Sequence, residues 1–118
     1  MIDLSGRKLK VKFAPDNSLT WGDLFDLKQD STGSFIGTLA VKSALPITGV
    51  VHSSGQIEFD AQLGEDRGVQ HFAGAVAIYG EREYAWMAGT YTIFRFGPLE
   101  KGTRAYYPFY AVEDEIIG

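Results

Sequence analysis

Asp23 is the residue whose type and position give this sequence its clearest chemistry. Asp23 lies two residues after Trp21 in the segment 20–29, so both side chains are expected on the same face of a strand, and this face is expected to point inward. A buried carboxylate is costly unless hydrogen bonds compensate it; the hydroxyls of Tyr91 and Tyr107, on the inward parity of their own segments, supply such partners. A few polar groups among apolar ones are typical of a ligand pocket. We therefore predict a ligand-binding site formed by Trp21, Asp23, Tyr91 and Tyr107; the alternative is that Asp23 lies at a rim and caps a turn.

No metal site, catalytic nucleophile or cofactor is predicted. A metal site needs three or four convergent ligands, whereas His52 and His71 are isolated in sequence and are expected to be exposed or structural. The absence of cysteine excludes disulfides, thiolate ligands and a cysteine nucleophile. The sequence also lacks a Gly-Lys-Ser/Thr phosphate loop and a Gly-x-Ser-x-Gly nucleophile elbow.

Charged residues that lie close in sequence are expected on solvated faces. Glu58 and Asp60 project from one strand face, and Glu81 and Glu83 project from a turn. Such pairs can perform acid–base catalysis, but solvated faces carry them routinely. The alternating lysines of the segment 8–12 fit a solvated strand face or a guard against edge-to-edge pairing, with phosphate contact as the alternative.

Four segments share one pattern: an apolar residue, a spacer, a glycine, a second spacer and another apolar residue. They are 35–39, 47–51, 72–76 and 87–91. This two-residue period predicts strands with a glycine at the middle of the apolar face. Glycine weakens a strand unless the sheet bends strongly or another group approaches the backbone, so we predict one curved sheet that closes on itself. The glycines either leave a cavity or make room for aromatic rings, and both interpretations stay open here.

The sequence predicts eight strands and no helix. The predicted strands, separated by turn residues such as those of the segment 43–46, are 7–13, 20–29, 34–42, 47–52, 56–62, 69–79, 84–95 and 104–112. Short connections favour antiparallel pairing of consecutive strands, a meander. Eight strands are usual for a small closed barrel, and closure removes exposed edges. The predicted fold class is all-β, a single antiparallel up-and-down meander barrel; an open five- or six-stranded barrel or a sandwich is the alternative.

Length and composition set the remaining limits. The 118 residues fit a single β-barrel domain, 1–118, and a hydrophobic content of 45% makes disorder unexpected. The net charge of -4 argues against a nucleic-acid partner. The sequence contains no window of about 18 apolar residues, so no membrane-spanning helix is predicted. No apolar signal segment follows Met1, so a cytoplasmic location is the default expectation, with a secreted or periplasmic one left open.

Aromatic residues on the outward parity of the last three predicted strands suggest an interface. Small alanines at positions 73, 75 and 77 accompany them. Because the three strands are consecutive, their outer faces are expected to form one patch, and its predicted interface residues are Tyr79, Tyr84, Trp86, Phe94, Tyr106 and Tyr110. A symmetric homo-oligomer is the commonest use of such a surface. The alternative is a slip of register, which would exchange the two faces.

The strand pattern resembles that of the avidin and streptavidin family. Phe35-Ile-Gly-Thr-Leu39, Ile47-Thr-Gly-Val-Val51 and Met87-Ala-Gly-Thr-Tyr91 are similar to the family's strand signatures, and Trp21 is similar to its early tryptophan. The resemblance implies a barrel, a ligand pocket and oligomers. The chain departs from the family in having only two tryptophans and no match for its early Asn and Ser ligand contacts, so no biotin-binding residue is transferred. Lipocalins and other calycin-like barrels fit equally well.

These observations lead to three functional interpretations. The first, and preferred, is a non-enzymatic barrel that binds a small apolar or aromatic ligand and self-associates. The second is a structural or assembly module with a solid interior that binds protein partners through the aromatic patch. The third, and least favoured, is a barrel enzyme of the cyclase or isomerase type, with Asp23 and Tyr91 as acid–base candidates.

Overall fold

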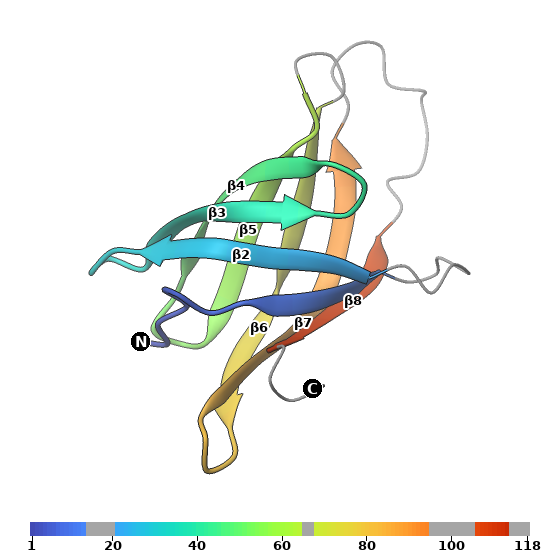
Figure 1. The fold of residues 1–118 in the computed structure, drawn as a ribbon. Coiled ribbons are helices and arrows are strands. Elements are labelled where there is room, and N and C mark those ends of the chain that lie inside the picture. The colour runs from blue at the N-terminus through green and yellow to red at the C-terminus, as the bar shows by residue number, and fades with distance from the viewer. Residues whose placement is uncertain (14–20, 65–67, 95–105, 114–118) are drawn as a thin grey trace.

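The computed structural model describes residues 1–13, 21–64, 68–94 and 106–113. Its strands are β1 (Leu9–Phe13), β2 (Trp21–Gln29), β3 (Ser34–Ala40), β4 (Ala44–Val51), β5 (Gln56–Gln62), β6 (Val69–Tyr79), β7 (Tyr84–Phe94) and β8 (Tyr107–Glu113). Each strand pairs with the next, and β8 pairs with β1, so the sheet closes into a barrel (Figure 1). The predicted all-β antiparallel meander barrel is confirmed.

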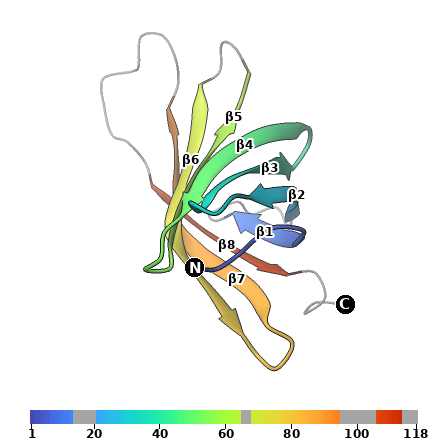
Figure 2. The ribbon, with the colours of Figure 1, turned by 90° about the vertical axis from the view of Figure 1, so that its left-hand side faces the viewer.

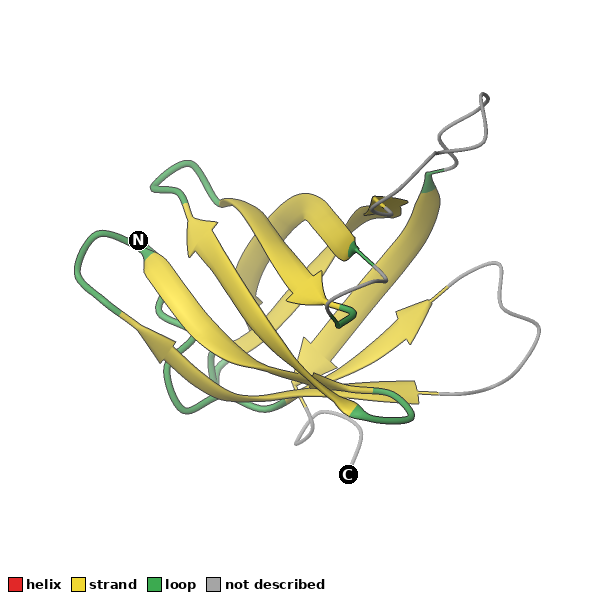
Figure 3. Ribbon diagram, turned by 90° about the horizontal axis from the view of Figure 1, so that it is seen from above, coloured by secondary structure: helices red, strands yellow, loops and turns green. Residues whose placement is uncertain are grey.

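The described part of the chain consists of strands and loops (Figure 3). Within it, no helix is long and apolar enough to cross a membrane. Strands β6 and β7 are the longest, with 11 residues each. Their hairpin projects beyond the other strands at one end of the barrel (Figure 2).

Strand β4 begins earlier than the sequence predicts. The predicted turn at 43–46 is wrong, because Ala44 already pairs with Ala40, and Pro46 pairs with Thr38. A proline inside a strand is tolerated where it need not donate to a second ladder. The ladder between β4 and β5 starts only at Ile47, so Pro46 lies just before the first pair that joins those two strands.

A β-bulge in β2 reverses which residues of this strand face the interior. The register with β3 shifts between Phe25 and Lys28, and Asp26 has a φ of 53°. A bulge inserts one extra residue, so the parity changes across it. Leu24 and Leu27 are therefore both buried although they are three residues apart. The sequence prediction that Trp21 and Phe25 share a face with Leu27 is wrong for this reason.

The four mid-strand glycines face the interior, and the space they leave is filled. A Cβ on Gly37 would lie 2.5 Å from Leu27 Cδ2, and one on Gly49 would lie 2.7 Å from Phe35 Cζ. Gly74 and Gly89 are directly paired partners in neighbouring strands. A Cβ on either would meet the backbone of the opposite strand. These glycines therefore allow the strands to coil tightly around side chains, which is the second of the two interpretations given above.

Aromatic rings fill the middle of the barrel. Phe72 is fully buried and stacks on Phe59, with ring centroids 4.6 Å apart and an interplanar angle of 10°. Phe109 meets Phe72 edge-on at 5.0 Å, and Phe13 approaches Phe72 at 5.9 Å. Offset and edge-to-face contacts of this kind add stability beyond simple burial. The interior at this level is a packed core.

Residues 1–7 lie across one end of the barrel and seal it. Leu4 is 1% exposed and belongs to the core cluster. Its backbone N–H donates to Oε1 of Gln29 at 2.9 Å, while Nε2 of Gln29 donates to the carbonyl of Ile2 at 2.7 Å. Arg7 forms an ion pair of 2.7 Å with Glu113, whose carboxylate also accepts the backbone N–H of Ala85. We call this the sealed end.

Candidate functional site

The structure divides the predicted ligand-binding residues between the two faces of the sheet. Asp23 pairs with Lys10 in the β1–β2 ladder, and Lys10 Nζ donates to Asp23 Oδ1 at 2.6 Å on the outer face. Trp21 is 39% exposed and lies on the same outer face. The inward orientation predicted for both residues is wrong, because the bulge of β2 lies between them and Leu27. Asp23 and Tyr91 therefore do not meet as an acid–base pair.

Tyr91 and Tyr107 remain together on the inner face. They are directly paired partners of β7 and β8, and their ring centroids are 5.5 Å apart. Tyr91 also meets the ring of Phe13 edge-on at 5.4 Å. Phe13 ends β1 at the opposite end from Leu9, which adjoins Glu113 of the sealed end. The two tyrosines thus lie toward the end of the barrel opposite the sealed end, and we call this opposite end the mouth.

A hollow of about 310 Å³ opens at the mouth, above the aromatic core. It is lined by a mixture of apolar and polar side chains: Phe13, Val41, Lys42, Ser43, Leu45, Leu63, Gln70 and Tyr91. Gln70 was missed by the sequence analysis, although it has the inward parity of Phe72 on β6. Lys42 was missed because it has the outward parity of the predicted strand 34–42, and Ser43 because it lies in the predicted turn 43–46; the structure places both in the connection between β3 and β4.

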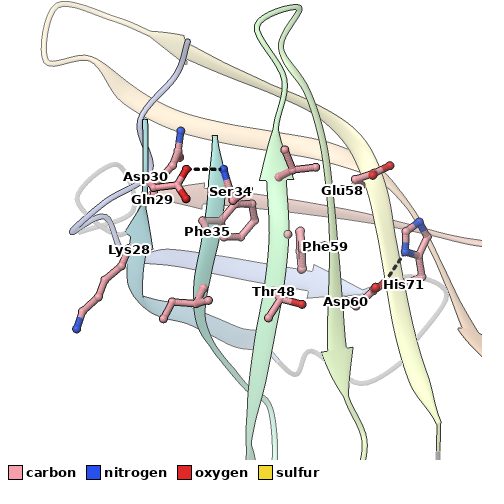
Figure 4. Close-up of a pocket in the computed structure, with 13 residues that line it drawn as sticks. Lys28, Gln29, Asp30, Ser34, Phe35, Thr48, Glu58, Phe59, Asp60 and His71 are labelled. Carbon is pink, nitrogen blue, oxygen red and sulfur yellow. Dashed lines mark hydrogen bonds and ion pairs between the residues drawn. The ribbon is translucent and has the colours of Figure 1, made fainter. Parts of the chain in front are cut away.

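A second and larger hollow, of about 670 Å³, lies on the outside of the barrel (Figure 4). We call it the outer groove. The pairing registers place one residue from each of five neighbouring strands in a single row across it: Lys28, Ile36, Thr48, Asp60 and His71. The row is continuous because each of these residues is the direct cross-strand partner of the next.

Polar contacts hold both ends of the outer groove in place. His71 Nδ1 lies 2.5 Å from Asp60 Oδ1, a pair formed between β5 and β6. At the opposite end, Asp30 accepts hydrogen bonds from the hydroxyl and the backbone N–H of Thr32. These bonds, led by that from the Thr32 hydroxyl, lower the pKa of Asp30 below the ordinary aspartate value. No group of three or more His, Asp and Glu side chains able to hold a metal occurs among the described residues.

The outer faces of β6, β7 and β8 carry exposed aromatic rings, and four of the six residues predicted to form an interface are exposed. Tyr79, Trp86, Tyr106 and Tyr110 are between 38% and 62% exposed. Tyr84 is half-buried, and the side chain of Phe94 lies outside the described part of the chain. Tyr110 is joined on the outer face by Trp21, with ring centroids 5.8 Å apart. We call the exposed rings of Trp21, Tyr79, Trp86 and Tyr110 the aromatic patch.

The barrel has a counterpart among solved structures. Apo shwanavidin matches it with a TM-score of 0.66 and 10% sequence identity, over 95% of this chain and 97% of that one. The predicted resemblance to the avidin and streptavidin barrel is therefore confirmed at the level of the fold. No protein-family model and no curated protein matches the sequence.

Proposed function

We propose that this avidin-like barrel is a non-enzymatic binding protein that takes a small aromatic or apolar ligand at its mouth. The observation that carries this proposal is the asymmetry of the barrel. One end is sealed by Leu4 and the Arg7–Glu113 ion pair, and the middle is filled by phenylalanine rings. Among the described residues, the other end has a hollow with an aromatic floor that can take a ligand.

The composition of the mouth suits a small, flat molecule. The rings of Phe13 and Tyr91 offer apolar surface, and burial of such surface contributes about 25 cal/mol per Å². Gln70, Ser43 and Lys42 place hydrogen-bond donors around it, which fix the orientation of a ligand. A volume of about 310 Å³ is at the small end of ligand sites, which commonly range from about 300 to 1,000 Å³. The site therefore favours a fragment-sized ligand over a long lipid.

A larger side chain in the hollow at the mouth should weaken ligand binding. We expect Leu45→Trp to weaken the binding of anilinonaphthalene sulfonate, an aromatic anion, by at least about tenfold, because the indole occupies the hollow. Tyr91→Phe keeps the ring and should change the affinity by less than about threefold, since only one hydroxyl is lost. A fluorescence titration measures both, and native mass spectrometry reports whether one probe molecule binds each chain. Unchanged affinity in Leu45→Trp would refute the mouth as the site.

Self-association through the aromatic patch is a second function that a specific observation favours. Trp86 is 38% exposed and Tyr110 is 44% exposed. Ala77 and Ala88, which pair with them across the sheet, are small. Rings beside small residues can interlock with a second copy across a two-fold axis. Such a patch is costly to leave in water.

Introducing a charged side chain into the aromatic patch should dissociate the oligomer. We expect Trp86→Glu to elute as a monomer at concentrations where the unchanged chain is an oligomer, because each copy would bury a carboxylate at the interface. Ile36→Glu is the matched control: Ile36 is 55% exposed but lies on the outer groove. Light scattering coupled to size exclusion gives the masses. A monomeric unchanged chain, or equal dissociation in both variants, would contradict this interface.

A further inference from the structure

The outer groove is separate from the mouth and from the aromatic patch. It crosses β2 to β6, and its row of directly paired residues runs perpendicular to the strands. Figure 4 labels Lys28, Thr48, Asp60 and His71 of this row. The barrel interior provides no part of this chemistry, because Phe35 and Phe59, which adjoin the groove, are buried core residues.

Along its row the groove presents the cation of Lys28 on β2, the apolar side chain of Ile36 on β3, the hydroxyl of Thr48 on β4 and the carboxylate of Asp60 on β5. Ile36 is 55% exposed, an unusual exposure for an isoleucine on a strand. The carboxylate of Glu58 is exposed in the row next to that of Asp60, and both residues line the groove. His71 contacts Asp60 at 2.5 Å and so restricts the orientation of its carboxylate. A ligand that matches this surface has an apolar group beside a positive charge.

The spacing between these features exceeds the two-residue repeat of an extended polypeptide by about 3 Å, a gap that a long basic side chain covers. Ile36 and Asp60 are two strands apart, which corresponds to about 10 Å at about 4.8 Å per strand. Side chains on the same face of an extended chain repeat every two residues, or about 7 Å. An apolar side chain over Ile36 thus places the residue two positions later where a lysine or arginine reaches Glu58 and Asp60.

We propose that the outer groove binds an extended segment of a partner protein in which an apolar residue is followed two positions later by lysine or arginine. Charge complementarity selects this occupant, since Glu58 and Asp60 place two carboxylates on β5 in a chain of net charge -4. The closed barrel offers no free strand edge among its eight strands. The segment is therefore recognised through side chains on the sheet face and not by addition of a strand.

Fluorescence anisotropy with a labelled peptide tests this directly. The probe is the hexapeptide Leu-Thr-Lys-Leu-Thr-Lys, and its comparison peptide carries glutamate in place of both lysines. We expect saturable binding of the basic peptide only, weakened at least about tenfold by Glu58→Lys. Glu81→Lys makes the same charge change on the exposed β6–β7 hairpin and should leave the affinity within about twofold.

Each other outcome overturns the proposal. Equal binding of the acidic peptide, or equal loss in Glu58→Lys and Glu81→Lys, would show that only overall charge is sensed. Displacement of the peptide by n-hexylamine at the same concentration as by unlabelled peptide would make the groove a site for small amines. Absence of binding to a chain whose circular dichroism shows the folded barrel would exclude a peptide of this pattern. The mouth is untouched by these variants, so its own test is independent.

Discussion

Gly89→Ala is expected to lower the free energy of unfolding by at least about 3 kcal/mol. A Cβ at this position would overlap the carbonyl oxygen of Ala73 and lie 2.6 Å from the Cα of Gly74. Both obstacles are backbone atoms of the neighbouring strand, so no side-chain rotation relieves the overlap. The β6–β7 ladder, which joins the two longest strands, would have to separate.

Gly22→Ala is the matched control for this variant. Gly22 also faces the interior, but an added Cβ would be 3.1 Å from Val41 Cγ2, 3.3 Å from the ring of Phe13 and 3.3 Å from the carbonyl oxygen of Ala40, whereas a Cβ at Gly89 would overlap the carbonyl oxygen of Ala73. Side chains can move by a few tenths of an ångström, and alanine restricts the unfolded chain, so we expect a change within about 1 kcal/mol. Urea denaturation followed by circular dichroism measures both. Similar stabilities for the two variants would mean that the strands at Gly74 and Gly89 are less closely paired than described.

The second large effect concerns the aromatic core. Phe72→Ala should cost about 3 to 5 kcal/mol, because it removes a fully buried ring and leaves a cavity. Four rings lose a partner at once, those of Phe13, Phe59, Tyr91 and Phe109. Tyr79→Ala, at a position 46% exposed, removes a ring of similar size from the surface and should cost less than about 1 kcal/mol.

A cavity in this place has a further measurable property. Apolar cavities of this size stay dry and take up benzene, so benzene should raise the melting temperature of Phe72→Ala. Benzene should not change the melting temperature of the unchanged protein, since its core is filled. Equal stabilisation of both proteins would indicate that the unchanged interior already contains empty space. The glycines would then serve a ligand cavity in the barrel, and the proposed site would move inward from the mouth.

The barrel could be predicted from the sequence because its signal is local and repeated. The glycine at the centre of four alternating segments indicates both strand and curvature, and the close backbone approach of Gly74 and Gly89 gives the physical reason. The outward aromatic rings of β6, β7 and β8 follow from the same alternation, since the ladders from β6 to β7 and from β7 to β8 have no register shift.

The predicted site failed where alternation is interrupted. One extra residue in β2, with Asp26 at positive φ, moves Trp21 and Asp23 to the outside. Aspartate adopts that conformation more readily than most residues, but nothing in its sequence neighbours marks it as a bulge. The contact between His71 and Asp60 could not be predicted from the sequence either, because it depends on the register between two strands and not on the spacing of residues along one strand.

The closure of the barrel also determines when the protein can acquire its structure during synthesis. Arg7 and Glu113 are 106 residues apart along the chain, yet they meet beside the ladder of β1 and β8. Ribosomes add about 5 to 20 residues per second, so β1 waits roughly 5 to 20 s for its second neighbour. Until then, both terminal strands of the growing sheet expose backbone groups that can pair with other chains. The alternating lysines of β1 lie on the strand that waits longest, where like charges discourage two nascent chains from joining.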